Sequence, residues 1–330
     1  MISGKFSIMA KQLDIPARLL VVIGGNAVHP DGVQGTAEEQ THFASATAHA
    51  LLPLMKPGTE LVVTHGNGPV VGKILMRQVI ARDRVTIMTL DICVAHSQGG
   101  IAYLLMQAFE NALREIGNRR HVACLLTDVD VDLDDSAFSK PTKPIGYFYE
   151  EEEARAIARE TGWLMREEAG RGWRHVVPSP NPVRIVEIDL IRNLADRGAV
   201  VIAGGGGGIP VTRNETGVRR GVEAVVDKDL TSALMANLLG IEVLMILTEA
   251  RTVALNFGTP QQRDIDTAGA AEIRSYQAQG QFSAGSMGPK IDAALRFLDG
   301  GGKRLVIGSI DQAVPALRGE AGTQILANND

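Results

Sequence analysis

The chain has 330 residues, of which 45% are hydrophobic and 22% charged, so it can bury a large core and has an ordinary globular composition. Its net charge of −5 and its lack of a basic run argue against a nucleic-acid partner, although a local basic pocket for a small anion fits this balance. Two isolated cysteines, Cys93 and Cys124, exclude a disulfide framework and predict buried thiols in a cytoplasmic protein. The sequence contains neither the apolar core of a signal peptide nor a run of transmembrane length, so no membrane contact is predicted.

The first two predicted strands both run into glycine turns. The apolar run over residues 19–23 predicts a buried strand, and Gly24-Gly25-Asn26 follows it directly. A helix is expected over about 36–55, and a second strand over 60–64 ends in His65-Gly66-Asn67-Gly68-Pro69. Both turns are candidate anion loops.

The second glycine turn does not carry a known dinucleotide or P-loop pattern. The spacing of Gly66, Gly68 and Gly72 misses G-x-G-x-x-G by one residue, and no acidic residue ends a following strand at the ribose distance. A Rossmann dehydrogenase is therefore disfavoured, and no G-x-x-x-x-G-K-[ST] occurs. His65 borders this turn, and we interpret it as a structural or hydrogen-bonding residue rather than an acid or base.

The middle of the chain interrupts an α/β alternation. A helix is expected over 96–116 and a strand over 121–126, but the alternation breaks between 128 and 178, where an acidic helix begins near Glu150. This break predicts an inserted subdomain over about 129–177. Four aspartates near its start could be metal ligands, but alternating acids more often form a solvated face, so we assign them no metal. They are Asp130, Asp132, Asp134 and Asp135.

The stretch over 200–210 joins an apolar strand to five consecutive glycines, Gly204 to Gly208. A helix over 187–197 leads into it, and the glycines fall at the carboxyl end of a predicted parallel strand, where open α/β sheets place ligands. Without Cβ atoms, successive N–H groups can converge on an anion. A flexible loop or a tight turn explains the same glycines, and this stretch alone does not decide between them.

Two lysines stand where helices are predicted to begin. One helix is expected from Lys228 to about Leu239, with Asp227 or Asp229 as its cap, and Lys290 opens a later helix in the same way. A lysine in a first helical turn is electrostatically misplaced unless an anion is bound there. The mismatch suggests a phosphate; the alternative is a pair of surface lysines.

The remaining elements complete an α/β fold. Strands are expected over 243–248 and 253–256, a helix over 267–279, and a last buried strand over 304–307 before a polar end. The glycine loops, the two lysines and Lys143 in a proline-rich turn suit phosphoryl transfer, in which catalysis is mostly positioning and charge neutralisation. No general base is needed if the acceptor is already an oxyanion.

Seven segments together resemble the carbamate kinases of the amino-acid kinase fold, and the resemblance runs from about residue 19 to the end of the chain. The segments lie at 23–27, 64–69, 141–146, 169–180, 205–210, 226–229 and 285–290. Pro-Thr-Lys-Pro-Ile-Gly around Lys143 and Gly-Arg-Gly-Trp-Arg around Trp173 are specific to the carbamate branch. The resemblance implies a three-layer α/β/α sandwich around a mainly parallel sheet, with an inserted protruding subdomain.

The same resemblance implies the domain organisation and the reaction. Residues 1–18 would be an N-terminal extension, 19–206 a carbamate or carbamoyl-phosphate lobe that includes the insertion at 129–177, and 207–330 a nucleotide-binding lobe. The implied reaction interconverts ATP and carbamate with ADP and carbamoyl phosphate, with Mg²⁺, in a cytoplasmic homodimer of arginine metabolism that runs catabolically toward ATP. Its partners would be these small molecules, without nucleic acid or membrane.

The resemblance also implies site residues, with no protein ligand assigned to the metal. The implied catalytic residues are Lys143, Lys228, Asp229 and Lys290. The implied substrate-binding residues are Gly24, Gly25, Asn26, Gly66, Asn67, Gly205 and Gly206. The implied nucleotide-binding residues are Lys228, Thr248, Met287 and Lys290.

Three positions depart from the family pattern. Val70 replaces a usual Gln, Asp128 replaces a Gln or basic residue, and Thr248-Glu249-Ala250-Arg251 replaces Thr-x-Val-Asp on the nucleotide side. Arg251 would either contact the nucleotide or point to solvent. Two other functions stay open: a catalytically weak member that binds a phosphate-bearing ligand as a sensor or assembly partner, and a kinase for another small carboxylate or phosphate.

Overall fold

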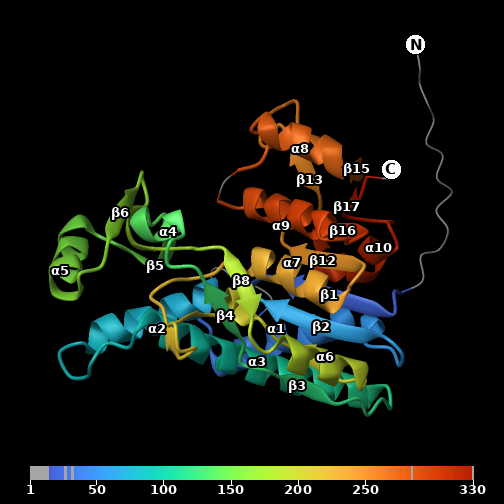
Figure 1. Ribbon diagram of the computed structural model, residues 1–330, viewed down its shortest axis with the longest axis horizontal. Coiled ribbons are helices and arrows are strands. Elements are labelled where there is room, and N and C mark those ends of the chain that lie inside the picture. Colours follow the sequence, from blue (N-terminus) through green and yellow to red (C-terminus); the bar gives the residue numbers. More distant parts are fainter. Residues whose placement is uncertain (1–14, 26–27, 31–32, 284, 329–330) are drawn as a thin grey trace.

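The structure is a computed structural model that describes residues 15–25, 28–30, 33–283 and 285–328 (Figure 1). Its main body is an eight-stranded sheet in the order β15-β17-β16-β12-β1-β2-β9-β3. Every neighbouring pair is parallel except β16 and β17. The strands are β1 (Arg18–Ile23), β2 (Glu60–His65), β3 (Val122–Cys124), β9 (Val200–Ile202), β12 (Val243–Thr248), β15 (Thr267–Gly269), β16 (Arg304–Ser309) and β17 (Thr323–Leu326).

Helices cover both faces of this sheet because side chains alternate along each strand. In β1, Leu20 and Val22 face a cluster with α6, α7, α8 and α9, whereas Leu19, Val21 and Ile23 face α1, α3 and α10. These helices are α1 (Ala37–Leu51), α3 (Leu90–Glu115), α6 (Ile188–Asp196), α7 (Lys228–Leu239), α8 (Ala270–Ala278), α9 (Met287–Asp299) and α10 (Ala313–Leu317). The predicted three-layer α/β/α sandwich is confirmed.

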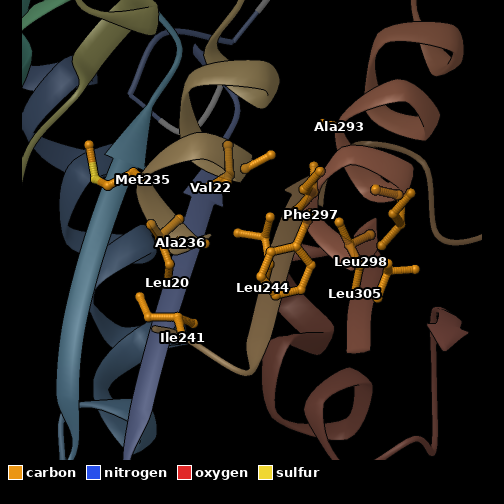
Figure 2. Close-up of a cluster of buried hydrophobic side chains, with 14 of the residues drawn as sticks. Leu20, Val22, Met235, Ala236, Ile241, Leu244, Ala293, Phe297, Leu298 and Leu305 are labelled. Atoms are coloured by element: carbon orange, nitrogen blue, oxygen red, sulfur yellow. The ribbon is translucent and has the colours of Figure 1, made fainter. Parts of the chain in front are cut away.

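Figure 2 shows the layer that positions α7 and α9, the two helices with a lysine in their first turn. Phe297 and Leu298 of α9 and Met235 of α7 lie against the inner strands of the sheet. Phe297 is completely buried. Burying a large aromatic ring stabilises the contact by a few kcal/mol, so the start of each helix is held at a fixed place at the sheet edge.

Two smaller sheets lie between residues 128 and 221 of the chain. One has the order β11-β10-β4-β8 and the other, β5-β7-β6, projects from the main body together with α5 (Figure 1). Their elements are β4 (Asp128–Val131), α4 (Ser136–Ser139), β5 (Lys143–Tyr149), α5 (Glu151–Thr161), β6 (Met165–Glu168), β7 (Gly172–Val177), β8 (Pro182–Ile185), β10 (Ile209–Arg213) and β11 (Arg219–Gly221). We call β5, α5, β6 and β7 the protruding subdomain.

The helix α2 (Gly68–Ala81) was not predicted, although its signal is present in the sequence. Val71, Leu75 and Val79 recur at helical spacing and are all buried. The glycine turn before it hid the start, because Asn67 and Pro69 read as loop residues although Pro is common in a first helical turn. Gly72 of α2 abuts β5: a Cβ there would lie 3.3 Å from Gly146 Cα.

Two predicted boundaries were wrong, and one strand was missed. α3 begins at Leu90 rather than His96, with Thr89 as its cap residue. Residues 267–269 form β15, not a helix, because they pair with β17. β17 itself was missed: Thr323 and Gln324 look polar in sequence, yet both are buried, and Gln324 accepts a hydrogen bond from Arg304 Nη1 at 3.2 Å. Tertiary pairing overrides local polarity there.

A few short elements complete the chain. They are the strands β13 (Val253–Leu255) and β14 (Arg263–Ile265), which pair as a separate hairpin, and the 3₁₀ turns η2 (Leu52–Leu54), η3 (Gly205–Gly207) and η4 (Ile310–Gln312). None of the helices in the described ranges is both long and apolar enough to cross a bilayer.

Candidate functional site

A buried carboxylate, Asp229, joins two lysines at the sheet edge. Asp227 caps α7, since its Oδ1 accepts a hydrogen bond of 2.9 Å from Asp229 N, and this fixes the first helical turn. Lys228 Nζ donates to both carboxylate oxygens of Asp229, at 3.1 and 3.2 Å. Lys290 Nζ, from the first turn of α9, donates to Asp229 Oδ2 at 3.0 Å. We call these three residues the inner cluster.

The charges of the inner cluster perturb one another. Burial alone would raise the pKa of Asp229, but the two lysines outweigh it and hold that pKa below its ordinary value. Burial alone would lower the pKa of Lys228, but the carboxylates of Asp229 and Asp227 outweigh it and raise that pKa. The pKa of Lys290 is lowered, by burial and then by the charge of Lys228. Lys290 therefore carries the less compensated positive charge.

These contacts qualify the electrostatic argument made for Lys228. Asp229 already compensates part of the charge in the first turn of α7, so the lysine does not by itself require a bound phosphate. Two ammonium groups share one carboxylate, however, which leaves the inner cluster one positive charge in excess. A buried excess of positive charge is suited to an anion.

Lys143 reaches the same place from the protruding subdomain. It is the first residue of β5, and its Nζ lies 3.2 Å from Asp227 Oδ2. The Lys143 side chain is 41% exposed, against 18% for Lys228 and 12% for Lys290. We call Lys143 and Asp227 the outer pair; its lysine is far more accessible to solvent than the lysines of the inner cluster.

The glycine turns after β1 and β2 meet beside Lys228. A Cβ on Gly66 would lie 2.7 Å from Gly25 N and 3.2 Å from Lys228 Cδ. Gly24 N donates to Leu247 O, and Gly66 N donates to Ile23 O, so both turns continue the sheet bonding. Glycine is required here because any side chain would force the two turns and the lysine stem apart.

The five-glycine stretch is a fixed, tight turn. Gly204, Gly206, Gly207 and Gly208 have φ between 65° and 92°. A Cβ on Gly205 would lie 2.3 Å from the His65 ring, and one on Gly206 would lie 2.2 Å from the Asn67 amide. These contacts account for the glycines by backbone conformation and close packing, so the flexible-loop alternative is wrong.

Three polar residues that the sequence did not lead us to predict, Ser97, Gln98 and Thr127, hold this turn in place. Gln98 Nε2 donates to Gly205 O at 2.9 Å, and Asn67 Nδ2 donates to Ser97 Oγ at 2.8 Å. Gly204 N donates to Thr127 Oγ1 at 2.9 Å. Ser97 and Gln98 are fully buried in α3, and two adjacent polar residues inside an apolar helical pattern were the available signal.

His65 has a structural role. Its ring is buried against Gly205, and its Nδ1 lies 3.0 Å from Gly66 O. Burial lowers the pKa of His65 to about 4, so the imidazole is neutral near pH 7. A ring enclosed in this way cannot reach a substrate proton, as the sequence interpretation expected.

A cavity of about 480 Å³ opens at the carboxyl ends of β1, β12 and β16. Gly24, Gly25 and Thr248 line it together with Arg251, Ser309 and Asp311. Arg251 is its only basic lining residue within the described ranges. Arg251, which departs from the family pattern, therefore faces this cavity.

One predicted site residue, Met287, packs against the apolar core around α7 and α9. It is the first residue of α9. Asn26 lies outside the described residues. The other predicted residues gather around the inner cluster, the outer pair, the glycine turns and the cavity.

The other departures from the family pattern have local structural partners. Val70 is partly buried against the apolar cluster of α1 and α3. Asp128 Oδ2 lies 2.8 Å from Arg219 Nη1, and burial, ahead of that arginine's opposing effect, raises the pKa of Asp128. Each change is thus accommodated where it stands.

The aspartates near residue 130 are engaged in protein contacts. Asp130 Oδ2 pairs with Arg184 Nη2 at 2.5 Å and Arg213 Nε at 3.3 Å, and Asp135 caps α4. Over the ranges that the structure describes, no three His, Cys, Asp or Glu residues gather as a metal site would require. Cys93 and Cys124 are free thiols, and burial raises the pKa of each to about 11.

Comparison with known proteins identifies the family. Residues 17–309 match the amino acid kinase family. A carbamate kinase of Pyrococcus furiosus is 43% identical over 311 residues, 94% of this chain and 99% of that protein. The carbamate kinase-like protein YahI of Escherichia coli K12 is 42% identical over 93% of this chain and 98% of its own length. The solved carbamate kinase from Giardia lamblia bound to AMP-PNP superposes with a TM-score of 0.88 at 39% identity, covering 94% of this chain and 98% of that one. The chain therefore belongs to the amino acid kinase family and, within it, to the carbamate kinases.

Proposed function

We propose that this chain catalyses reversible phosphoryl transfer between ATP and carbamate, and that it runs mainly from carbamoyl phosphate and ADP toward ATP and carbamate. The observation that carries the proposal is the inner cluster, an excess positive charge at the start of two helices where the glycine turns after β1 and β2 meet. Helix amino ends and lysines together stabilise the spread charge of a transferring phosphoryl group.

In the ATP-forming direction, a β-phosphate oxygen of ADP attacks the phosphorus of carbamoyl phosphate. The new P–O bond forms as the bond to the carbamate oxygen breaks, and carbamate leaves with that electron pair. The nucleophile is already an oxyanion, so no side chain has to remove a proton. Lys228 and Lys290 offset the charge on the transferring group, and Asp229 orients both lysines.

Lys143 contributes from the other side. Its ammonium group pairs with Asp227 at the edge of the inner cluster, which supports a role at the carbamoyl end of the substrate. The close-packed turns at Gly25 and Gly66 let backbone approach the same end, and the N–H groups of Gly24 and Gly66 hold these turns on the sheet. Asn26 belongs to this turn by its sequence position.

The nucleotide occupies the cavity at the sheet edge. Thr248 and Gly25 line that cavity, and the Giardia lamblia relative was solved bound to AMP-PNP, an ATP analogue by its name. In this arrangement residues 207–330 form a nucleotide-binding lobe and residues 19–206 a carbamoyl-phosphate lobe that includes the protruding subdomain. Gly205, Gly206 and Met287 support the neighbouring site residues by packing rather than by contact with ligand.

Mg²⁺ enters with the nucleotide. This ion usually keeps several waters and binds through substrate phosphates, where it neutralises the developing charge. Asp229, the most buried carboxylate of the site, already accepts hydrogen bonds from two lysines. We therefore assign no side chain of this chain as its ligand.

The active unit is a homodimer in the cytoplasm, in a catabolic route such as arginine breakdown. α3 supports the dimer because it presents Ile92 and Tyr103, 43% and 65% exposed, beside Gly99 and Gly100, where a Cβ would meet nothing within 4 Å. An exposed helix face with apolar side chains and bare glycines suits close packing against a second copy. Reduced thiols at Cys93 and Cys124 suit a reducing compartment.

The direct test is an ATP-forming assay with ADP, Mg²⁺ and carbamoyl phosphate. We expect turnover that depends on all three. A folded protein that binds ADP without forming ATP would reject the proposal. That result would favour a phosphate-ligand sensor or assembly protein, an alternative supported by Arg251 in the cavity and by the relative named only as carbamate kinase-like. Turnover with a different small carboxylate or phosphate would favour a kinase for that acceptor.

A further inference from the structure

A second cavity, of about 370 Å³, lies between the main body and the protruding subdomain. Its walls come from the loop that joins α2 to α3, from the end of α5, from β7 and from the segment before α7. It shares no lining residue with the cavity at the sheet edge within the described ranges. We call it the rear cavity.

The rear cavity contains a buried hydrogen-bonding group without a partner. His175 lines it and is only 7% exposed, and its Nδ1 is buried with no hydrogen bond to any described residue. Its ring stacks on Trp163 with centroids 4.2 Å apart and planes at 1°. Burial lowers the pKa of His175 to about 4, so near pH 7 the ring is neutral and one nitrogen is an acceptor. An unpaired buried ring nitrogen is unfavourable, and in the tautomer that carries its proton on Nε2 a donor beside Nδ1 would relieve it.

The charge around the rear cavity is negative. Glu160 and Glu223 both line it. Arg82 offsets Glu160, with Nε 2.5 Å from Oε2. Glu223 accepts a hydrogen bond of 3.2 Å from Leu90 N, but no described residue forms an ion pair with it. Partial burial and then the nearby Asp91 carboxylate raise the pKa of Glu223 against the effect of the Leu90 N–H group, so a cation beside it would be favoured.

The remaining wall is mainly apolar, with the threonines Thr86, Thr89 and Thr161 among its lining residues. Leu75, Met88, Leu90 and Trp163 line the rear cavity next to the acidic groups. The volume is at the lower end of the range for small-molecule sites, which are mostly apolar with a few polar groups. This combination suits a short hydrocarbon stem that ends in a positively charged donor.

We propose that the rear cavity binds a small organic cation, an alkylammonium or alkylguanidinium, whose charged group contacts Glu223 and donates a hydrogen bond to His175. The stem packs against Leu75, Met88 and Trp163. Such a ligand differs in charge and shape from the phosphate-bearing substrates of the proposed reaction, so the site is separate from that chemistry.

Both polar walls of the rear cavity connect to the outer pair by short stretches of chain. On β7, His175 pairs with Ile145 and Val177 pairs with Lys143. Glu223 stands four residues before Asp227, and Val225 N donates to Pro178 O at 3.0 Å between them. A cation that holds Glu223 and His175 together thus fixes the two segments that carry Lys143 and Asp227. We infer that it tunes the position of Lys143.

Calorimetric titration of n-butylammonium chloride into the full chain tests the site, with n-butanol as the neutral probe of the same shape. We expect saturable binding of the ammonium and none of the alcohol. Glu223→Gln and His175→Phe should each weaken binding at least tenfold; phenylalanine keeps a ring against Trp163 while it removes both nitrogens. The matched control is Glu152→Gln, at an exposed acid in the first turn of α5, which should bind like the wild type.

No saturable binding by wild type would overturn the proposal, as would equal binding by Glu223→Gln or by n-butanol. Thermal unfolding of each variant establishes that it is folded. The measurement is independent of turnover, so it stands whether or not the chain forms ATP. If it does, n-butylammonium should change the KM for carbamoyl phosphate in wild type and not in Glu223→Gln; identical kinetics with bound cation would overturn the coupling to Lys143.

Discussion

The inner cluster and the outer pair both join lysine to aspartate, yet they differ in burial and in how they are held. Lys228, Asp229 and Lys290 sit on two helices packed on the central sheet, and the Asp229 side chain is 3% exposed. Lys143 is 41% exposed and is carried by a strand of the small protruding sheet. The inner charges are fixed by the core, whereas the outer charge depends on where the protruding subdomain stands.

A lysine–aspartate contact has a different energetic role in each of these two places. In the buried cluster, removal of one partner leaves an uncompensated charge away from water, which is strongly unfavourable. At the outer pair, where the lysine is half-exposed, water and salt screen the interaction, and its contribution to stability is small. The inner cluster therefore combines stability with charge neutralisation, and the outer pair contributes mainly to positioning.

The largest expected effect is on the inner carboxylate. Asp229→Ala should lower the free energy of unfolding by about 3–5 kcal/mol, because two buried ammonium groups lose their shared partner. Urea denaturation at pH 7 measures it. Asp227→Ala is the comparison at the outer pair and should cost about 1 kcal/mol, mostly through loss of the α7 cap. Equal losses in the two variants would contradict the distinction between the two regions.

The inner lysines should control the chemical step. Lys228→Ala and Lys290→Ala should each lower kcat by about 10² or more with the fold retained, because each removes a charge stabiliser held in place before the reaction. Steady-state ATP formation gives the rates, and circular dichroism checks the fold. Lys303→Ala, at an exposed lysine paired with Glu242, is the control and should keep the wild-type rate. Wild-type rates in either inner variant would exclude that lysine from the site.

Acid should destabilise the main body, through His65, and the protruding subdomain, through His175, in the same pH window. The folded-state pKa values of His65 and His175 are both lowered, to about 4, by burial, so their stabilisation is complete above about pH 6.5 and is lost as pH falls toward 4. At pH 5, each histidine should reduce the free energy of unfolding by about 2 kcal/mol relative to pH 7.

His175→Phe separates the two contributions, because of these two histidines it leaves only His65, which lies in the main body. Its unfolding free energy should fall less steeply between pH 7 and pH 5 than that of wild type. The measurement is a set of urea denaturation curves at several pH values. A variant slope identical to that of wild type would show that His175 does not titrate in this window.

The outer lysine should have a smaller kinetic effect than the inner ones. Lys143→Ala is expected to lower kcat/KM by about tenfold, because a half-exposed charge stabilises less than a buried one. Its neighbour Lys140 is also exposed, and Lys140→Ala is the matched control. A loss as large as that of Lys290→Ala would mean that the protruding subdomain buries Lys143 during the reaction.

The smallest expected effect concerns Arg251, the residue of the cavity that departs from the family pattern. Arg251→Asp should weaken ADP binding by a few-fold, because it replaces the basic lining residue with an acid beside the nucleotide phosphates or base. Calorimetric titration of ADP measures it, with Arg318→Asp as an exposed control at another loop. Tighter binding by Arg251→Asp would show that the arginine has cost affinity, and an unchanged dissociation constant would reject any contact.

Much of this arrangement follows from local sequence. The continuous apolar runs at 19–23 and 243–248 predict buried parallel strands, since side chains on both faces must be covered by helices. Asp227 before Lys228 determines where α7 begins, because a capping carboxylate satisfies a free N–H group of the first turn. The lysine positions and the glycine turns were therefore predictable from the sequence.

Only the tertiary structure decided what those residues meet. The sequence placed Lys228 and Lys290 at helix starts, but that one carboxylate joins them depends on α7 and α9 packing side by side on one sheet face. The pairing of Lys143 with Asp227, 84 residues apart, depends on the protruding subdomain. β17 forms although Thr323 and Gln324 are polar, because it pairs with β16 on one side and β15 on the other. Such contacts arise from long-range packing and hydrogen bonding, which no local pattern of residues encodes.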